Sequence, residues 1–120
     1  MHTRKLETSN IEHVQEYYKA GLRKDFTEMA KYLHPEVVFL APLAKLNGRE
    51  AVVEAAKGFF GFLQSIEFRA GFANDNQVMI AYNAIFPDPV GKFPTAIYVT
   101  FKDGLMSQME LFYDPRPLLA

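Results

Sequence analysis

The sequence contains no cysteine, and this absence excludes several kinds of site. Without cysteine the chain cannot form disulfides, zinc–thiolate centres or thiol nucleophiles, and a reducing compartment is favoured. Long apolar runs are missing as well, and the first ten residues, MHTRKLETSN, lack the apolar core of a signal peptide. We therefore expect a cytoplasmic protein that makes no use of a membrane.

The chain also lacks an excess of charge of either sign. Its 13 basic and 14 acidic residues give a formal net charge of −1, and the basic residues form no run. Nucleic acids and anionic membrane surfaces bind clustered Lys and Arg, so neither is an expected partner. The three histidines lie far apart, and no phosphate-binding glycine motif is present. The sequence thus indicates no metal and no cofactor.

Hydrophobic residues are abundant: they make up 49% of the 120 residues, with 11 Phe and 6 Tyr. That content is sufficient for one core, so we expect a single domain over residues 10–117. Residues 1–9 are polar and are predicted to be a flexible N-terminal segment.

Hydrophobic periodicity predicts helices followed by strands. Apolar residues at three- and four-residue steps predict helices over residues 11–24, 26–33 and 49–62. Period-two alternation and continuous apolar runs predict strands over 36–41, 66–72 and 78–86, and a hairpin over 95–114. The expected fold class is α+β, with three helices packed on a strongly bent, mixed or antiparallel sheet.

The hairpin is expected to fix the sheet register. Asp103-Gly104 between two apolar runs predicts a two-residue loop that pairs Lys102 with Leu105. Unbroken pairing then places Glu110 opposite Ile97. The face that would form a pocket wall carries Thr95, Ile97, Val99, Phe101, Met106, Gln108, Glu110, Phe112 and Asp114. The other face is also largely apolar, which indicates that it is covered as well.

Three local segments carry a resemblance to a known family: VQEYY at 14–18, LNGREAV at 46–52 and LFYDPRP at 111–117. With the order of elements, they resemble the NTF2-like superfamily, and within it the SnoaL-like and ketosteroid isomerase proteins, over about residues 10–117. The resemblance implies a cone-shaped fold, a pocket between the concave sheet face and the helices, and a homodimer formed through the outer sheet face.

The ketosteroid isomerases allow individual positions to be compared. Tyr17 matches the first-helix tyrosine that stabilises an oxyanion in that group. Ala41, before Pro42, stands where the general-base aspartate is found, and Ile97 stands at the second acid. Two of the three roles are therefore vacant, and steroid isomerisation by that mechanism is not expected.

Glu110 and Tyr17 are the predicted catalytic pair. A carboxyl among apolar side chains is desolvated, which raises its pKa toward the range useful for acid/base catalysis, and Tyr17 would donate to an oxyanion. Predicted ligand contacts are Gln108, Phe112, Ile97, Val99 and Asp114. Two alternatives stay open: Glu110 and Tyr17 form a structural hydrogen bond, or Glu110 reaches solvent. Asp114 could instead pair with Arg116 or Arg69.

Two functions follow from these residues. One is a pocket protein that binds a small hydrophobic or weakly polar molecule and carries out isomerase- or cyclase-like acid/base chemistry. The alternative, indicated by the vacant positions at Ala41 and Ile97, is a non-catalytic module for ligand binding or dimerisation. Whether the chain is an enzyme stays open from the sequence.

Overall fold

A computed structural model describes residues 2–119, without the side chains of residues 2–8. The helices are α1 (His2–Leu22), α2 (Phe26–Ala30), α3 (Arg49–Phe62) and α4 (Arg116–Leu119). The strands are β1 (Leu33–Ala41), β2 (Ala44–Asn47), β3 (Ser65–Asn74), β4 (Gln77–Ile85), β5 (Lys92–Lys102) and β6 (Leu105–Phe112). They form one six-stranded sheet in the order β2-β1-β6-β5-β4-β3.

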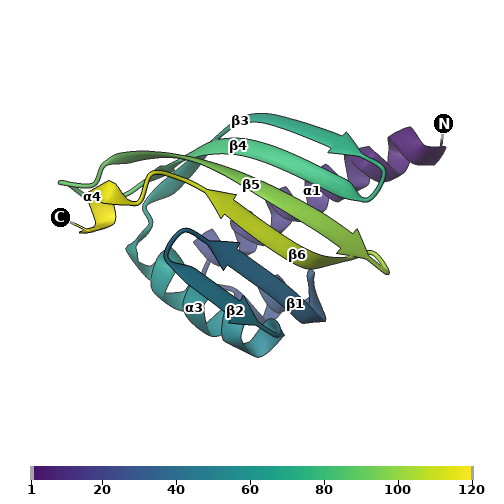
Figure 1. Ribbon diagram of the computed structural model, residues 1–120, viewed down its shortest axis with the longest axis horizontal. Helices are drawn as coiled ribbons and strands as arrows, with labels where there is room; N and C mark the ends of the chain where they lie inside the picture. Colours follow the sequence, from purple (N-terminus) through teal and green to yellow (C-terminus); the bar gives the residue numbers. More distant parts are fainter. Residues whose placement is uncertain (1, 120) are drawn as a thin grey trace.

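The sheet is mixed, because β1 pairs with β6 in parallel and every other neighbouring pair is antiparallel. Helix α1 crosses behind the sheet, and α3 lies beside β1 and β2 (Figure 1). This arrangement confirms the α+β prediction. It differs in detail, since α1 begins at His2 rather than Ile11 and α4 was not expected. The predicted flexibility of residues 1–9 stays a prediction.

The bounds of α3 agree with the sequence prediction, while α2 is shorter than predicted. Asp25 caps α2, and its carboxylate accepts a hydrogen bond from the Glu28 backbone N–H at 3.1 Å. Alternate residues of β4 and β5 are buried against the helices, whereas their neighbours point to the other face. The sheet therefore has an inner face that meets α1 and α3 and an outer face that they do not cover.

The β5–β6 hairpin forms as predicted at its turn and differs beyond it. Asp103 and Gly104 have φ values of 54° and 77°, as a type I′ turn requires, and Lys102 pairs with Leu105. The register then shifts by one residue, so that Thr100 pairs with Gln108 and not with Ser107. The Ser107 hydroxyl donates to the Thr100 carbonyl oxygen at 2.9 Å. Ser107 is thus the extra residue of a β-bulge.

This bulge reverses the faces of the rest of β6. Met109 pairs with Val99 and faces inward, whereas Glu110 pairs with Tyr98 on the outer face. The predicted pairing of Glu110 with Ile97 is therefore wrong. Unbroken alternation would bury Gln108 and Glu110 in an apolar interior, where an unpaired carboxylate is very costly. Because of the one extra residue, Met109, Leu111 and Tyr113 face the interior in place of Gln108 and Glu110.

Gly21 permits close packing of α1 on α3. A Cβ atom at this position would lie 2.5 Å from the nearest ring atoms of Phe60, which is 1% exposed. Gly21→Ala is expected to destabilise the fold by about 1–2 kcal/mol, because steric overlap outweighs alanine's better helix propensity. Gly61→Ala in α3 is the control, since no atom lies within 4 Å of its added Cβ. Urea unfolding of both variants measures the difference; equal or higher stability of Gly21→Ala would contradict the contact.

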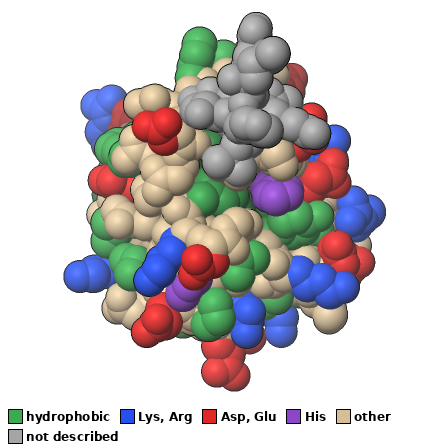
Figure 2. Space-filling model, turned by 90° about the vertical axis from the view of Figure 1, so that its right-hand side faces the viewer, with side chains coloured by type: hydrophobic (Ala, Val, Ile, Leu, Met, Phe, Trp, Pro, Cys, Tyr) green, Lys and Arg blue, Asp and Glu red, His purple; other side chains and the backbone are tan. Residues whose placement is uncertain are grey.

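Over the described residues, no helix is long and apolar enough to cross a membrane. Figure 2 views the end of the molecule that carries the start of α1 and the β5–β6 turn. Acidic and basic side chains are interspersed over the part of this surface that is described. The mixed signs agree with the near-zero net charge of the sequence.

Candidate functional site

A cavity of about 330 Å³ lies between the inner sheet face and the helices. Its volume falls within the range of about 300–1,000 Å³ that is common for small-molecule sites. Its aromatic lining comes from Tyr17, Tyr18, Phe39, Phe59, Phe60, Phe62, Tyr82, Phe86, Phe93 and Tyr113. The remaining wall comes from Ala41, Ala44, Leu46, Val52, Ala55, Ala56, Gly58, Thr95, Met109, Leu111 and Leu118.

Small residues on α3 leave this space open. Ala55, Ala56 and Gly58 line the cavity where larger side chains would fill it. The helix still buries Val52 and Phe60 on the same side, so it is anchored on both sides of the small residues. The aromatic rings around the cavity meet at steep angles, as between Phe59 and Phe60, whose ring planes are 83° apart. Edge-to-face rings pack firmly, so the walls are well supported.

Among the polar side chains of the described lining, all but Thr95 are tyrosines. The Tyr18 and Tyr82 hydroxyls are hydrogen-bonded at 2.9 Å, and α1 places Tyr17 directly beside Tyr18. Burial raises the pKa of Tyr17 and of Tyr18 well above the ordinary value, and the nearby Tyr82 phenol adds to both shifts. Burial also raises the pKa of Tyr82, against the opposing effect of its bond to Tyr18. At neutral pH these phenols are therefore hydrogen-bond donors and not bases.

The Tyr17 hydroxyl is the polar group that stands ready for a ligand. Its residue is 3% exposed and lines the cavity. Among the described residues, the Tyr17 hydroxyl has no hydrogen-bond partner. It is also not completely buried, in contrast to the Nδ1 atom of His13, which has neither a partner nor exposed surface. A ligand that fills the cavity must accept a hydrogen bond from this hydroxyl, because leaving a donor buried without a partner costs roughly 1–3 kcal/mol.

The described lining contains no Asp, Glu, His, Lys or Arg. Thr95, its one hydroxyl outside the tyrosines, donates to the Phe93 carbonyl oxygen at 3.3 Å. Tyr113 also has a raised pKa owing to burial, which a hydrogen bond from the Leu43 backbone partly offsets. The site is thus an uncharged, aromatic cavity with phenolic donors.

A model of the SnoaL-like domain family matches residues 14–109. The chain belongs to this family. None of the curated proteins compared with it matches. Solved structures share the fold of this SnoaL-like domain at low sequence identity. A protein from Kribbella flavida aligns with a TM-score of 0.83 at 21% identity, over 90% of this chain and 88% of that chain.

Two further solved structures are similar to the SnoaL-like domain. An NTF2-like protein of unknown function from Cytophaga hutchinsonii has a TM-score of 0.80 at 18% identity, over 92% of this chain and 95% of that chain. A steroid delta-isomerase from Pseudomonas aeruginosa has a TM-score of 0.74 at 18% identity, over 91% of this chain and 82% of that chain. At such identities the likeness establishes the fold and leaves the chemistry open.

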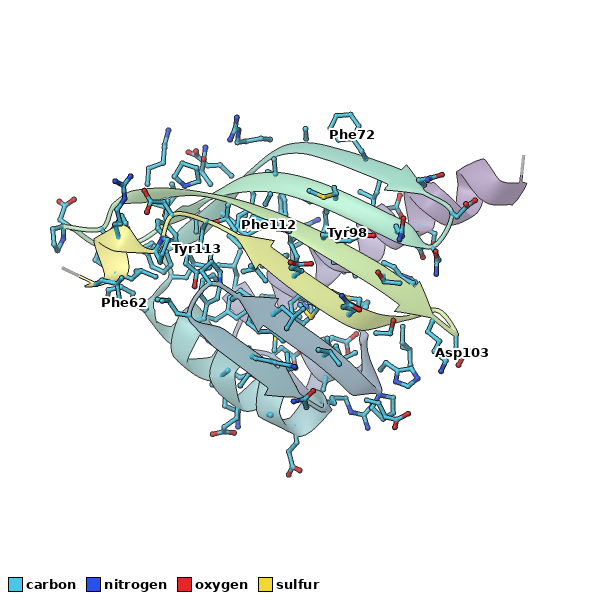
Figure 3. The ribbon with its side chains drawn as sticks, viewed as in Figure 1. Phe62, Phe72, Tyr98, Asp103, Phe112 and Tyr113 are labelled. Carbon is cyan, nitrogen blue, oxygen red and sulfur yellow. The ribbon has the colours of Figure 1, made fainter. Side chains whose placement is uncertain are left out.

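Tyr17 lies in the cavity of the SnoaL-like domain, as the sequence predicts, but its predicted partner Glu110 does not. Gln108, Glu110 and Phe112 lie on the outer face, where Tyr98 and Phe112 are visible in front of the strands (Figure 3). Placing these three residues on a pocket wall was therefore wrong, and the cause is the Ser107 bulge. No carboxylate of β6 reaches the Tyr17 hydroxyl from that face.

Ile97 and Val99 face inward as predicted, and both are fully buried. They pack in the core of the SnoaL-like domain and do not line the cavity, so their prediction as ligand contacts is not supported by its geometry. Asp114 was predicted either to contact ligand or to pair with an arginine, and it pairs with Arg116 at 2.6 Å. This pairing lowers the pKa of Asp114.

Sequence reasoning missed Tyr18, Tyr82 and Tyr113 as cavity residues. Tyr82 is the polar side chain of the otherwise apolar inner face of β4, and Tyr18 follows Tyr17 directly, so both carried a local signal. Tyr113 could not be found without the bulge, because unbroken alternation places it outside. Phe62, Tyr113 and α4, which all contribute to the lining, lie together at the opposite end of the molecule from Asp103 (Figure 3).

Proposed function

We propose that this domain binds a small, uncharged and mainly apolar molecule that carries one hydrogen-bond acceptor, which Tyr17 recognises. The observation that carries the proposal is the unpartnered Tyr17 hydroxyl in a cavity whose described lining has no charged side chain. Apolar ligand surface gains about 25 cal/mol per Å² on entering such a lining. An ionised group would lose its hydration without gaining a counter-charge.

The same features favour binding over acid/base catalysis. General acid/base catalysis needs a group whose pKa lies near the working pH, within hydrogen-bond reach of the substrate. The buried phenols have pKa values shifted away from neutrality, and Glu110 faces the other side of the sheet. The proposed function is therefore non-catalytic ligand binding, with isomerase- or cyclase-like turnover as the outcome that would contradict it.

Tyr17→Phe is expected to weaken binding of the neutral fluorescent ketone prodan by up to about tenfold, since one hydrogen bond contributes roughly 0.5–1.5 kcal/mol. The ketone's bound emission is also expected to shift to the blue, because its carbonyl loses a donor. Fluorescence titration measures both effects. Tyr98→Phe is the matched control, since Tyr98 lies on the outer face.

Equal affinity and equal emission in the Tyr17→Phe and parent proteins would remove Tyr17 from ligand recognition. If mass spectrometry showed that prodan or another neutral ketone is chemically changed during incubation with the protein, the proposed function would be catalysis and not binding alone. Weakened binding in Tyr98→Phe would move the site to the outer face.

We further propose that two copies of the domain pair through the outer sheet face. This face exposes Phe72, Met79 and Phe112 to 71%, 41% and 47%. Large apolar side chains gathered on one face commonly mark an interaction surface. Light scattering tests the pairing; a monomer mass that persists at high micromolar concentration would contradict it.

A further inference from the structure

Helix α4 is the part of the cavity wall that is least tied to the rest of the molecule. Leu118 lines the cavity although it is 41% exposed, and α4 buries none of its residues. The other wall residues come from strands of the sheet, from α1 and α3, or from the short connections that follow them. Opening the wall elsewhere would break strand pairing or core packing, whereas moving α4 would not.

The hydrogen bonds that hold α4 are all local, as far as the described residues show. The Leu118 backbone N–H donates to the Pro115 carbonyl oxygen at 2.9 Å. The Arg116 backbone N–H donates to Asp114 at 3.0 Å, and its guanidinium forms a fork on the same carboxylate. Pro115 and Pro117 restrict the backbone on either side of Arg116. Asp114 belongs to the connection between β6 and α4, so its pairing with Arg116 fixes how α4 is attached to the sheet.

We propose that α4 is the gate of the cavity, through which ligand enters and leaves, with Leu118 as the side chain that closes it. This inference rests on the proposed ligand site. The Asp114–Arg116 pair fixes the conformation of the chain between β6 and α4 and so favours the closed position, and Phe62, which also lines the cavity, is 51% exposed. A gate limits passage in both directions, whereas an ordinary wall contact affects only the bound state.

Stopped-flow fluorescence with prodan tests the gate in the full chain. Arg116→Gln removes the pairing with Asp114 and leaves the cavity lining unchanged, so association and dissociation rates are both expected to rise, by about threefold to tenfold, with the dissociation constant changed less than about twofold. Leu118→Ala is expected to speed both rates as well. Leu119→Ala is the control, because Leu119 is 66% exposed and is not part of the lining.

Unaltered rates in Arg116→Gln and Leu118→Ala, with normal binding by the parent protein, would overturn the gate and leave the proposed function standing. Faster dissociation with unaltered association would also overturn it, since Leu118 would then be a simple contact. Absence of prodan binding by the parent protein would overturn the proposed function and the gate with it.

Discussion

Replacing Ala56 with leucine is expected to lower the affinity for prodan by more than about 100-fold, which corresponds to roughly 2.7 kcal/mol of binding free energy. Ala56 lies on the inward side of α3, is 8% exposed and lines the cavity. A leucine side chain would extend into the empty space and occupy the volume that the ligand needs. Because that space is empty, the fold should not lose stability.

The matched control for this substitution is Ala51→Leu, an exposed position on the same helix that does not line the cavity. Fluorescence titration gives the affinities, and urea unfolding confirms that both variants are folded. Undiminished binding in folded Ala56→Leu would show that the ligand binds elsewhere. A loss of binding in Ala51→Leu would show that the effect belongs to the helix as a whole.

The free energy of unfolding is expected to fall steeply above pH 10, where tyrosines of the unfolded chain ionise. Burial raises the pKa of Tyr17, Tyr18 and Tyr82 in the folded state from the ordinary value of 10.0. Between the two pKa values the folded state binds more protons than the unfolded state, so stability decreases as the pH rises. Below pH 10 both states are protonated, and the contribution is fully present.

Each of these buried tyrosines contributes a slope of about 1.4 kcal/mol per pH unit, so the three together cost about 4 kcal/mol by pH 11. This is a large share of a typical domain stability of about 5–15 kcal/mol. Urea unfolding between pH 8 and pH 11 measures the slope, and Tyr17→Phe should reduce it by about one third. A free energy of unfolding that stays constant up to pH 11 would contradict the burial of these phenols.

Much of the fold could be predicted because local rules govern it. Helix α3 has the bounds expected from its apolar period, and the turn at Asp103-Gly104 follows from residues that tolerate positive φ. Helix α1 was placed correctly in its amphipathic part, but its start at His2 was missed because residues 2–9 carry no apolar period. Helix α4 was missed because Pro115 and Pro117 suggested a stop.

The candidate site could be predicted only in part, because it depends on one residue of register. Residues of β6 can alternate between the two faces in two ways: either Met106 and Glu110 point inward, or Met109 and Tyr113 do. In the structure, the first pattern holds before Ser107 and the second holds after it. The physical reason for the bulge is burial: without it, the carboxylate of Glu110 and the amide of Gln108 would lie in the interior, and with it apolar side chains take their place. Tyr17 lines the cavity as expected, because it lies on a helix, where a bulge in β6 has no influence, while its catalytic role stays a prediction.

The selectivity of the cavity for an uncharged ligand is most directly tested by titrating the parent protein with 2-acetylnaphthalene and with 2-naphthoate, which are close in shape and differ in charge. Isothermal titration calorimetry at neutral pH should show that the ketone binds and that the carboxylate binds at least about 100-fold more weakly, because an ion leaves water without meeting a counter-charge. Equal or tighter binding of 2-naphthoate would contradict an uncharged site at Tyr17.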